Sequence, residues 1–165
     1  MSGTENGAPQ IGGPQIGDRA PDFDLPATGG GRVNSATLRG RPFVLYFYPK
    51  ADTSACTQEA VAFGPLGERI AVVGVSRDPL RAVERFAAKH GIGFPLGSDP
   101  DGTAAMAYGC WVEKSMYGRR YMGVERSTFL VDADGVVRGA WRKVTVPGHA
   151  AAVETAAAAL ERTQP

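Results

Sequence analysis

A continuous run of aromatic and aliphatic residues at positions 43–48 (FVLYFY) is the feature that most constrains the fold of this chain. A strand exposed on one face alternates polar and apolar residues, whereas a run without polar residues is typical of a strand covered on both faces. Residues 70–75 (IAVVGV) form a second run of this kind. Two such strands need helices on both sides of their sheet, so the sequence predicts an α/β protein.

The segments around these two runs carry helix signals. Residues 56–63 are predicted to form a helix that ends at the Gly-Pro pair 64–65. After the second run, Asp78 can cap a helix that has Pro79 at its first position and ends at Gly91. A strand, a helix and a second strand in this order predict a parallel pair joined by a right-handed crossover.

Two turn signals predict β-hairpins at the ends of this unit. The glycines at 29–31 predict a small N-terminal β-hairpin, and the Asp-Gly pair 134–135 predicts another between residues 127–131 and 136–141. An alanine-rich helix is expected after the Pro-Gly pair 147–148. Together these elements predict a mixed central sheet with helices on both faces, and a thioredoxin-like fold fits their order best.

Residues 1–16 differ from the rest of the chain because they are rich in Gly, Pro and small polar residues. Such a segment cannot bury enough apolar area to offset its ordering entropy, so we expect a flexible N-terminal tail. Residues 17–165 show no second linker or change of composition, and they are expected to form one domain.

Charge and hydropathy exclude several classes of partner. Lys and Arg total 18 against 17 Asp and Glu, a formal net charge of +1, so the chain has no strong field to attract nucleic acid. Its longest apolar runs are far shorter than the roughly 18 to 20 residues that cross a bilayer, so no membrane partner is expected. The first residues lack the basic and apolar regions of a secretory signal, and we therefore expect a cytoplasmic location.

Cys56 lies where the loop after the first predicted strand enters a helix. Ligand sites of open α/β sheets lie at this end of the strands, and the helix dipole there stabilises a thiolate. Thr53, three residues earlier, can cap the helix through its hydroxyl or hold a polar substrate. Pro49 is expected to fix the direction of the loop and to shield the sulfur from water. A free cysteine can also be a small buried hydrophobic residue, so position alone leaves both roles of Cys56 open.

Three separated segments resemble one protein family. The pattern Pro-x-x-x-Thr-x-x-Cys, formed by Pro49, Thr53 and Cys56, resembles the active-site motif of the peroxiredoxins. The flanking sequences YFYPK and CTQEAVAF are similar to the bacterioferritin comigratory protein or peroxiredoxin Q branch of that family. Residues 121–132 (YMGVERSTFLVD) and the opening 17–25 resemble the same branch, so the likeness covers nearly the whole chain after the predicted tail.

The resemblance implies a thiol-dependent peroxidase that reduces hydrogen peroxide and organic hydroperoxides without a metal or organic cofactor. Cys56 is then the peroxidatic thiolate, which becomes a sulfenic acid. Thr53 orients the peroxide, Pro49 belongs to the peroxide-binding loop, and Arg126 stabilises the thiolate and the leaving oxygen. Thioredoxin or a small thiol is the implied reductant, and the chain is expected to be a monomer or a weak homodimer. From the residues alone, Arg126 can also be a surface cation at a strand end.

The chain departs from the branch pattern at the position of the resolving cysteine. Many members of the branch carry that cysteine five residues after the peroxidatic one, where this chain has Val61. Cys110 stands where relatives typically carry an apolar residue such as valine, and it has two interpretations. It is either a small buried hydrophobic residue or the residue that resolves Cys56 within the chain or across a dimer. Without a resolving partner, an external thiol would reduce the sulfenic acid directly.

The remaining polar residues carry weaker signals. No spacing of His or Cys matches a zinc site, and no glycine-rich loop matches a nucleotide site. His90 and His149 are expected to cap helices or to be exposed, and Arg119 and Arg120 to mark a solvated loop. Glu59 occupies the place of the second thiol of a disulfide reductase, which disfavours that activity. The alternatives to a peroxidase are a peroxide sensor and a redox-inert thioredoxin-like interaction module.

Overall fold

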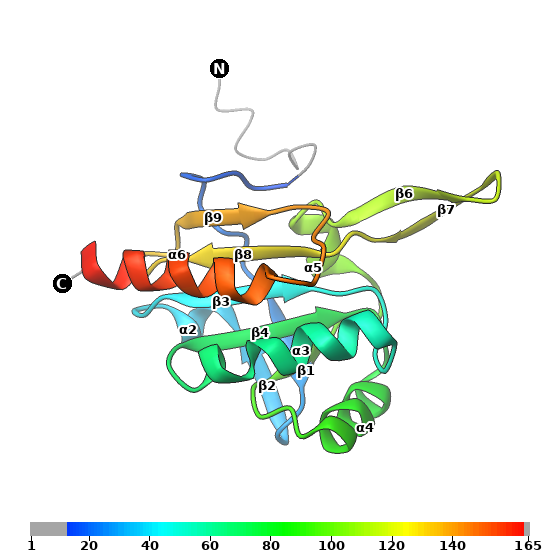
Figure 1. Ribbon diagram of the computed structural model, residues 1–165, viewed down its shortest axis with the longest axis horizontal. Coiled ribbons are helices and arrows are strands. Elements are labelled where there is room, and N and C mark those ends of the chain that lie inside the picture. Colours follow the sequence, from blue (N-terminus) through cyan, green and yellow to red (C-terminus); the bar gives the residue numbers. More distant parts are fainter. Residues whose placement is uncertain (1–12, 164–165) are drawn as a thin grey trace.

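A seven-stranded mixed sheet forms the centre of the protein, and helices lie on both of its faces (Figure 1). The computed structural model describes residues 13–163. The strands are β1 (Asp24–Ala27), β2 (Gly31–Asn34), β3 (Phe43–Phe47), β4 (Ala71–Ser76), β5 (Leu96–Ser98), β6 (Trp111–Met116), β7 (Arg119–Val124), β8 (Ser127–Val131) and β9 (Val137–Trp141). The helices are α2 (Ser35–Leu38), α3 (Ser54–Gly67), α4 (Leu80–His90), α5 (Thr103–Ala107) and α6 (His149–Thr163). The sheet order is β2-β1-β5-β4-β3-β8-β9, and β6 pairs with β7 in a separate two-stranded sheet.

Strand β3 lies inside the sheet, between β4 and β8, and separates two apolar cores. It pairs in parallel with β4 and antiparallel with β8, and all five of its residues are buried. Leu45 and Phe47 point into one core, which α5 and α2 cover. Val44 and Tyr46 point into the other core, which holds buried side chains of α3, α4 and α6. The predicted α/β class, with a strand covered on both faces, is therefore confirmed.

Both predicted hairpins are present. Strands β1 and β2 pair antiparallel, and Ala27 of β1 also pairs with Gly97 of β5, which joins this N-terminal β-hairpin to the main sheet. Strands β8 and β9 pair antiparallel around Gly135, whose φ of 85° is the left-handed conformation that glycine adopts without strain. The turn chemistry of these segments was sufficient to predict their pairing.

Helix α3 is longer than predicted, because it continues through Gly64 and Pro65 to Gly67. The expected end at the Gly-Pro pair was wrong. The last turn is held by tertiary packing, since Phe63 and Leu66 are both buried in the core beneath the helix. Burial of these side chains outweighs the hydrogen bond that the Pro65 nitrogen cannot donate.

The predicted cap of α4 was also wrong, since the helix begins at Leu80 with Pro79 as its N-cap and no side-chain capping bond. The Asp78 carboxylate instead accepts hydrogen bonds from the Ala51 backbone N–H at 2.7 Å and the Ser76 hydroxyl at 2.8 Å. Asp78 therefore ties the end of β4 to the loop that follows β3.

Strands β6 and β7 form a hairpin that projects from the body of the molecule, and we call it the arm (Figure 1). A solvated loop was expected at Arg119 and Arg120, but both residues lie in β7, where they pair with Met116 and Ser115 of β6. Their side chains are exposed, as predicted. The turn at Tyr117 and Gly118 has positive φ at both residues, which matches the twist of a two-residue hairpin.

Only residues 13–16 of the predicted tail are described, and residues 1–12 lie outside the described part of the chain. Gly13 and Pro14 are buried. A Cβ atom at Gly13 would lie 2.1 Å from the Tyr108 carbonyl oxygen, so this glycine permits the close approach of two backbones. Within the described residues, no helix has both the length and the apolar character that a membrane crossing requires.

Candidate active site

Cys56 lies in the first turn of α3, directly after the loop that leaves the carboxyl end of β3. Its side chain is buried, with 1% of the residue exposed, in the core that contains α3, α4 and α6. Thr53 is the N-cap residue of α3, but it makes no side-chain capping bond. Its hydroxyl instead donates to the Lys50 carbonyl at 2.9 Å, so the capping interpretation of Thr53 was wrong. Thr53 and Pro49 are both exposed on the loop around the buried sulfur.

Arg126 connects the thiol of Cys56 to a carboxyl group on the same helix. It lies between β7 and β8, and its Nη2 donates to Cys56 Sγ at 3.4 Å. Its Nη1 donates to Glu59 Oε1 at 2.7 Å. The Arg126 side chain is only 14% exposed, so its interpretation as a surface cation was wrong.

Glu59 is a member of this site that the sequence reasoning missed. The residue is 1% exposed, and its second oxygen, Oε2, has no hydrogen-bond partner among the described residues. Burial raises the pKa of Glu59 to about 7, although the nearby Arg126 cation opposes that shift. The spacing of Cys56 and Glu59 could have revealed this, because residues three apart on a helix share one face. Since Cys56 points into the protein, Glu59 does so as well.

Two tyrosines of β3 and its following loop lie in the same core as Cys56. The hydroxyls of Tyr46 and Tyr48 are buried, and neither has a partner among the described residues. Burial raises the pKa of both phenols, and the carboxyl of Glu59 adds to the effect. Both side chains are therefore neutral near pH 7 and place polar but uncharged atoms beneath the site.

The loop that holds Thr53 is also tied to the end of α4. Asp52 has a φ of 63°, and its carboxylate contacts Lys89 Nζ at 3.0 Å and His90 Nε2 at 2.9 Å.

His149 is buried, with Nε2 2.7 Å from the Thr128 hydroxyl and the ring between Phe63 and Trp141. The expectation that both histidines cap helices or are exposed was therefore wrong: His90 is half-buried against Asp52, and the His149 ring packs in the core.

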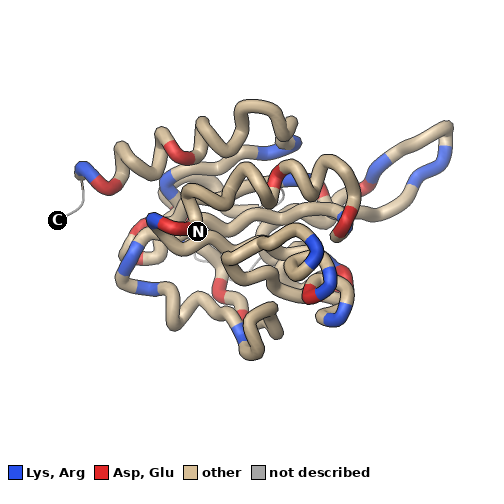
Figure 2. The backbone as a smooth tube through the Cα atoms, turned by 60° about the horizontal axis from the view of Figure 1, so that its bottom comes forward, with Lys and Arg blue, Asp and Glu red and all other residues tan. Residues whose placement is uncertain are grey.

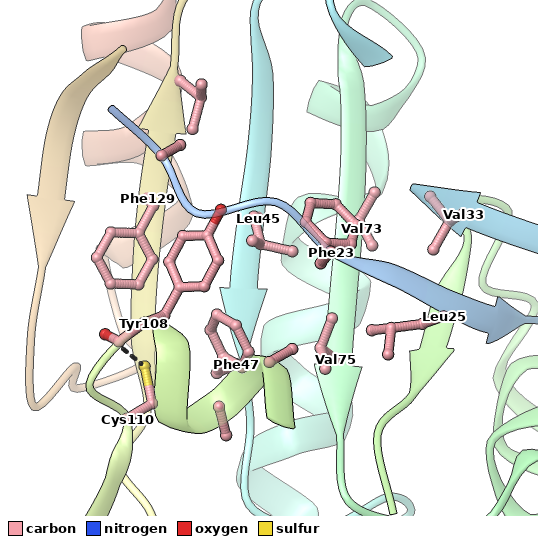
Figure 3. Close-up of a cluster of buried hydrophobic side chains, with 14 of the residues drawn as sticks. Phe23, Leu25, Val33, Leu45, Phe47, Val73, Val75, Tyr108, Cys110 and Phe129 are labelled. Carbon is pink, nitrogen blue, oxygen red and sulfur yellow. Dashed lines mark hydrogen bonds between the residues drawn. The ribbon is translucent and has the colours of Figure 1, made fainter. Parts of the chain in front are cut away.

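Cys110 lies on the other face of the sheet from Cys56. Figure 3 shows its side chain beside Tyr108 and Phe129, in the core that also contains Leu45 and Phe47. Its thiol donates to the Tyr108 carbonyl at 3.6 Å. Burial raises the pKa of Cys110 to about 12, so the group is a neutral thiol near pH 7. Both cysteines are free in the structure.

Among the described residues, no group of three or more His, Cys, Asp or Glu side chains is placed to hold a metal ion. The site that the structure does assemble consists of a buried thiol, a guanidinium and a buried carboxyl group. A thiol next to a fixed cation at a helix N-terminus is suited to nucleophilic attack through its thiolate form.

Comparison with known proteins identifies the family. The model of the AhpC/TSA family matches residues 16–140. The chain belongs to the AhpC/TSA family. Its relatives include the Peroxiredoxin Bcp of Xanthomonas campestris, 44% identical over 143 residues that span 81% of this chain and 88% of the relative. The Peroxiredoxin Bcp of Bacillus subtilis is 40% identical over 142 residues, which span 83% of this chain and 90% of the relative.

Solved structures agree with this assignment to the AhpC/TSA family. The bacterioferritin comigratory protein of Xanthomonas campestris has a TM-score of 0.78 at 41% identity and covers 83% of this chain and 90% of its own. A cysteine-to-serine mutant of Xylella fastidiosa PrxQ has a TM-score of 0.82 at 37% identity and covers 88% of this chain and 96% of its own. The resemblance to the peroxiredoxin Q branch and the thioredoxin-like fold are thus confirmed. Family and relatives support a thiol-dependent peroxidase activity for this peroxiredoxin.

Proposed function

We propose that this peroxiredoxin reduces hydrogen peroxide and organic hydroperoxides through a sulfenic acid at Cys56. The contact of 3.4 Å between Arg126 Nη2 and Cys56 Sγ carries the proposal, because it places a permanent cation beside a buried sulfur. The thiolate attacks one peroxide oxygen, a sulfur–oxygen bond forms and the oxygen–oxygen bond breaks. The leaving oxygen takes a proton and departs as water or an alcohol.

The other residues of the site have supporting roles in this proposal. Arg126 stabilises the thiolate before attack and the negative charge on the leaving oxygen during it. Thr53 and Pro49 lie on the exposed loop over the sulfur, where the Thr53 hydroxyl orients the peroxide and Pro49 limits access of water. Glu59 is a positioning residue, because its bond to Nη1 directs the other nitrogen of the guanidinium toward Cys56.

We propose a one-cysteine cycle, in which an external thiol reduces the sulfenic acid. Val61 stands at the position where many members of the branch carry a resolving cysteine, and its side chain is exposed on α3. Cys110 is buried on the opposite face of the sheet and is held as a neutral thiol, which supports a packing role rather than a resolving one. Thioredoxin or a small thiol is the proposed reductant, and no metal or organic cofactor takes part.

Treatment of the reduced protein with one equivalent of hydrogen peroxide tests this proposal. A dimedone-type sulfenic trap is present, and intact mass is read on non-reducing samples. We expect an adduct on Cys56 with Cys110 still free. Loss of two hydrogens, or a covalent dimer without adduct, would show that Cys110 resolves Cys56. Rapid oxidation that no thiol reverses would favour the peroxide sensor, and no oxidation would favour the redox-inert module.

Several expectations of the sequence remain predictions for this proposed enzyme. They are a cytoplasmic location, a monomer or weak homodimer, a single domain for residues 17–165, and the absence of nucleic-acid and membrane partners. Sedimentation of the reduced and oxidised protein tests the oligomeric state directly.

A further inference from the structure

The arm exposes a concentration of large apolar side chains. Tyr117 at its tip is 97% exposed and Met116 is 55% exposed, while Tyr121 and Met122 are 44% and 48% exposed. Folded proteins seldom expose several such residues together unless the surface binds something. Tyrosine and methionine are also enriched in protein interfaces, because they supply large contact areas.

The arm is basic as well as apolar. It carries Lys114, Arg119 and Arg120 against a single acidic residue, Glu113 (Figure 2). Arg120 Nε and Glu113 Oε2 are 3.3 Å apart in an exposed ion pair. Such pairs contribute little to stability, because water screens the two charges. Arg119 forms no ion pair with any residue of the described chain. The arm therefore presents net positive charge around its apolar tip.

The root of the arm lies next to the candidate active site. Strand β7 ends at Val124, two residues before Arg126, and the Arg126 guanidinium contacts Cys56. Lys114 of β6 is partly buried, and both this burial and the charge of the nearby Arg126 lower its pKa. Trp111 is held under the Arg77 guanidinium at 4.3 Å, which anchors the root.

We propose that the arm is the docking surface for an acidic protein whose dithiol reduces oxidised Cys56. This inference rests on the proposed function, because it names the class of reductant for the same site. Six residues of strand extend about 20 Å, while a domain of about 100 residues has a radius of gyration of about 13 Å. A partner of that size can touch the arm and extend to the site beside its root, where Arg126 contacts Cys56.

The charge of the arm argues for an acidic partner rather than a second copy of this chain. Two arms packed against each other would bring Arg119 and Arg120 of both copies together, which is repulsive. A small thiol has too little surface to use the exposed tip. An acidic protein surface with an apolar patch matches both properties of the arm.

The docked reaction proceeds through a mixed disulfide between the partner and Cys56. One partner thiolate attacks the sulfenic sulfur of Cys56, a mixed disulfide forms, and the sulfenic oxygen takes a proton and leaves as water. The second partner thiol, as its thiolate, attacks the partner sulfur of the mixed disulfide. Cys56 is released as a thiolate, and the partner carries away a disulfide, so two electrons pass from the partner to Cys56.

The test uses a thioredoxin of net negative charge as the probe and the variant Arg119→Glu/Arg120→Glu. We expect the KM of this variant for thioredoxin to be about tenfold higher than that of wild type, because the charge reversal removes electrostatic attraction. Turnover with dithiothreitol should be unchanged, because that small reductant needs no docking surface. The matched control is Arg41→Glu/Arg162→Glu, which makes the same change of charge before β3 and at the end of α6, away from the arm (Figure 1).

Two further measurements separate docking from a general effect of charge. Tyr117→Ala should also raise the KM for thioredoxin while preserving turnover with dithiothreitol, because it removes apolar contact area. Raising the ionic strength from about 0.01 M to about 1 M shortens the screening length from about 30 Å to about 3 Å. We expect the difference between wild type and the arm variant to shrink by most of its size over that range.

Several outcomes overturn the docking proposal without affecting the proposed function. They are an unchanged KM in the arm variant, an equal rise in the control variant, turnover with dithiothreitol but not with any acidic thioredoxin, and a change of oligomeric state in the arm variant. The last outcome would assign the arm to a second copy of the chain. Failure of the sulfenic trap to label wild-type Cys56 would overturn the proposed function and the docking proposal together.

Discussion

Glu59 and Cys56 share one cation, because Arg126 donates to Glu59 Oε1 at 2.7 Å and to Cys56 Sγ at 3.4 Å. Both acidic groups are buried, so water cannot replace the guanidinium as a partner for either. When the carboxyl is protonated, the positive charge of Arg126 is available to the thiolate. When the carboxyl is ionised, it competes with the sulfur for that charge. The single guanidinium therefore links the carboxyl of Glu59 to the sulfur of Cys56.

Replacement of the sulfur nucleophile is the most direct test of the site. Cys56→Ser should abolish peroxide reduction, because a neutral hydroxyl is a far weaker nucleophile than a thiolate. The rate of peroxide consumption with dithiothreitol measures the effect. Turnover that survives in Cys56→Ser would remove Cys56 from the reaction.

Arg126→Lys should slow the oxidation of Cys56 by about a hundredfold, comparable to the loss of one transition-state hydrogen-bond donor. Lysine keeps the charge, but its single nitrogen cannot reproduce the two separate contacts of the guanidinium. Stopped-flow oxidation by hydrogen peroxide measures the rate. Arg138→Lys is the matched control, because Arg138 pairs with Asp132 in a separate ion pair. Equal rates for Arg126→Lys and wild type would contradict the role of the guanidinium.

The protonation of Glu59 should make stability depend on pH. Burial raises its pKa from 4.5 to about 7, so the folded state holds this proton more tightly than the unfolded state does. The cost of burying the carboxylate is absent below about pH 4.5, appears as the pH rises toward 7 and is complete above it. The full cost is about 3 kcal/mol, since each pKa unit corresponds to about 1.4 kcal/mol.

Glu59→Gln isolates this contribution, because the amide keeps the shape of the side chain and does not titrate in this range. Denaturant unfolding at pH 4.5 and at pH 8 should show wild type losing about 3 kcal/mol relative to the variant as the pH rises. Cys56 should also be oxidised more slowly in this variant, because Glu59 positions Arg126 in the proposed site. A stability difference that is constant with pH would show that folding does not raise the pKa of Glu59.

Cys110→Val should retain peroxidase turnover with both thioredoxin and dithiothreitol. Valine fills the apolar site that Cys110 occupies beside Tyr108 and Phe129, and the high pKa of the thiol argues against a nucleophilic role. Intact mass after peroxide should show the same Cys56 adduct as wild type. Loss of thioredoxin-dependent turnover in this variant, with normal oxidation of Cys56, would establish Cys110 as the resolving residue.

The amino-acid sequence by itself determined the elements whose signals are local. The unbroken apolar run at 43–48 predicted the central strand, because a strand buried on both faces tolerates few polar residues. Turn residues predicted both hairpins, and the position of Cys56 after that strand placed the thiol at a helix N-terminus. Local signals were less reliable at Pro65 and Asp78, where packing and a loop contact outweighed the usual helix boundary rules.

Only the tertiary structure decided how distant residues meet. Arg126 lies 70 residues from Cys56 and 67 from Glu59, and no local pattern shows that its two nitrogens contact both. The sheet also separates the two thiols, because Cys56 on α3 packs in the core on one face while Cys110, just before β6, packs in the core on the other. Charge sharing and separation of the cysteines depend on distances between elements, and those distances are set only when the strands pair and the helices pack on them.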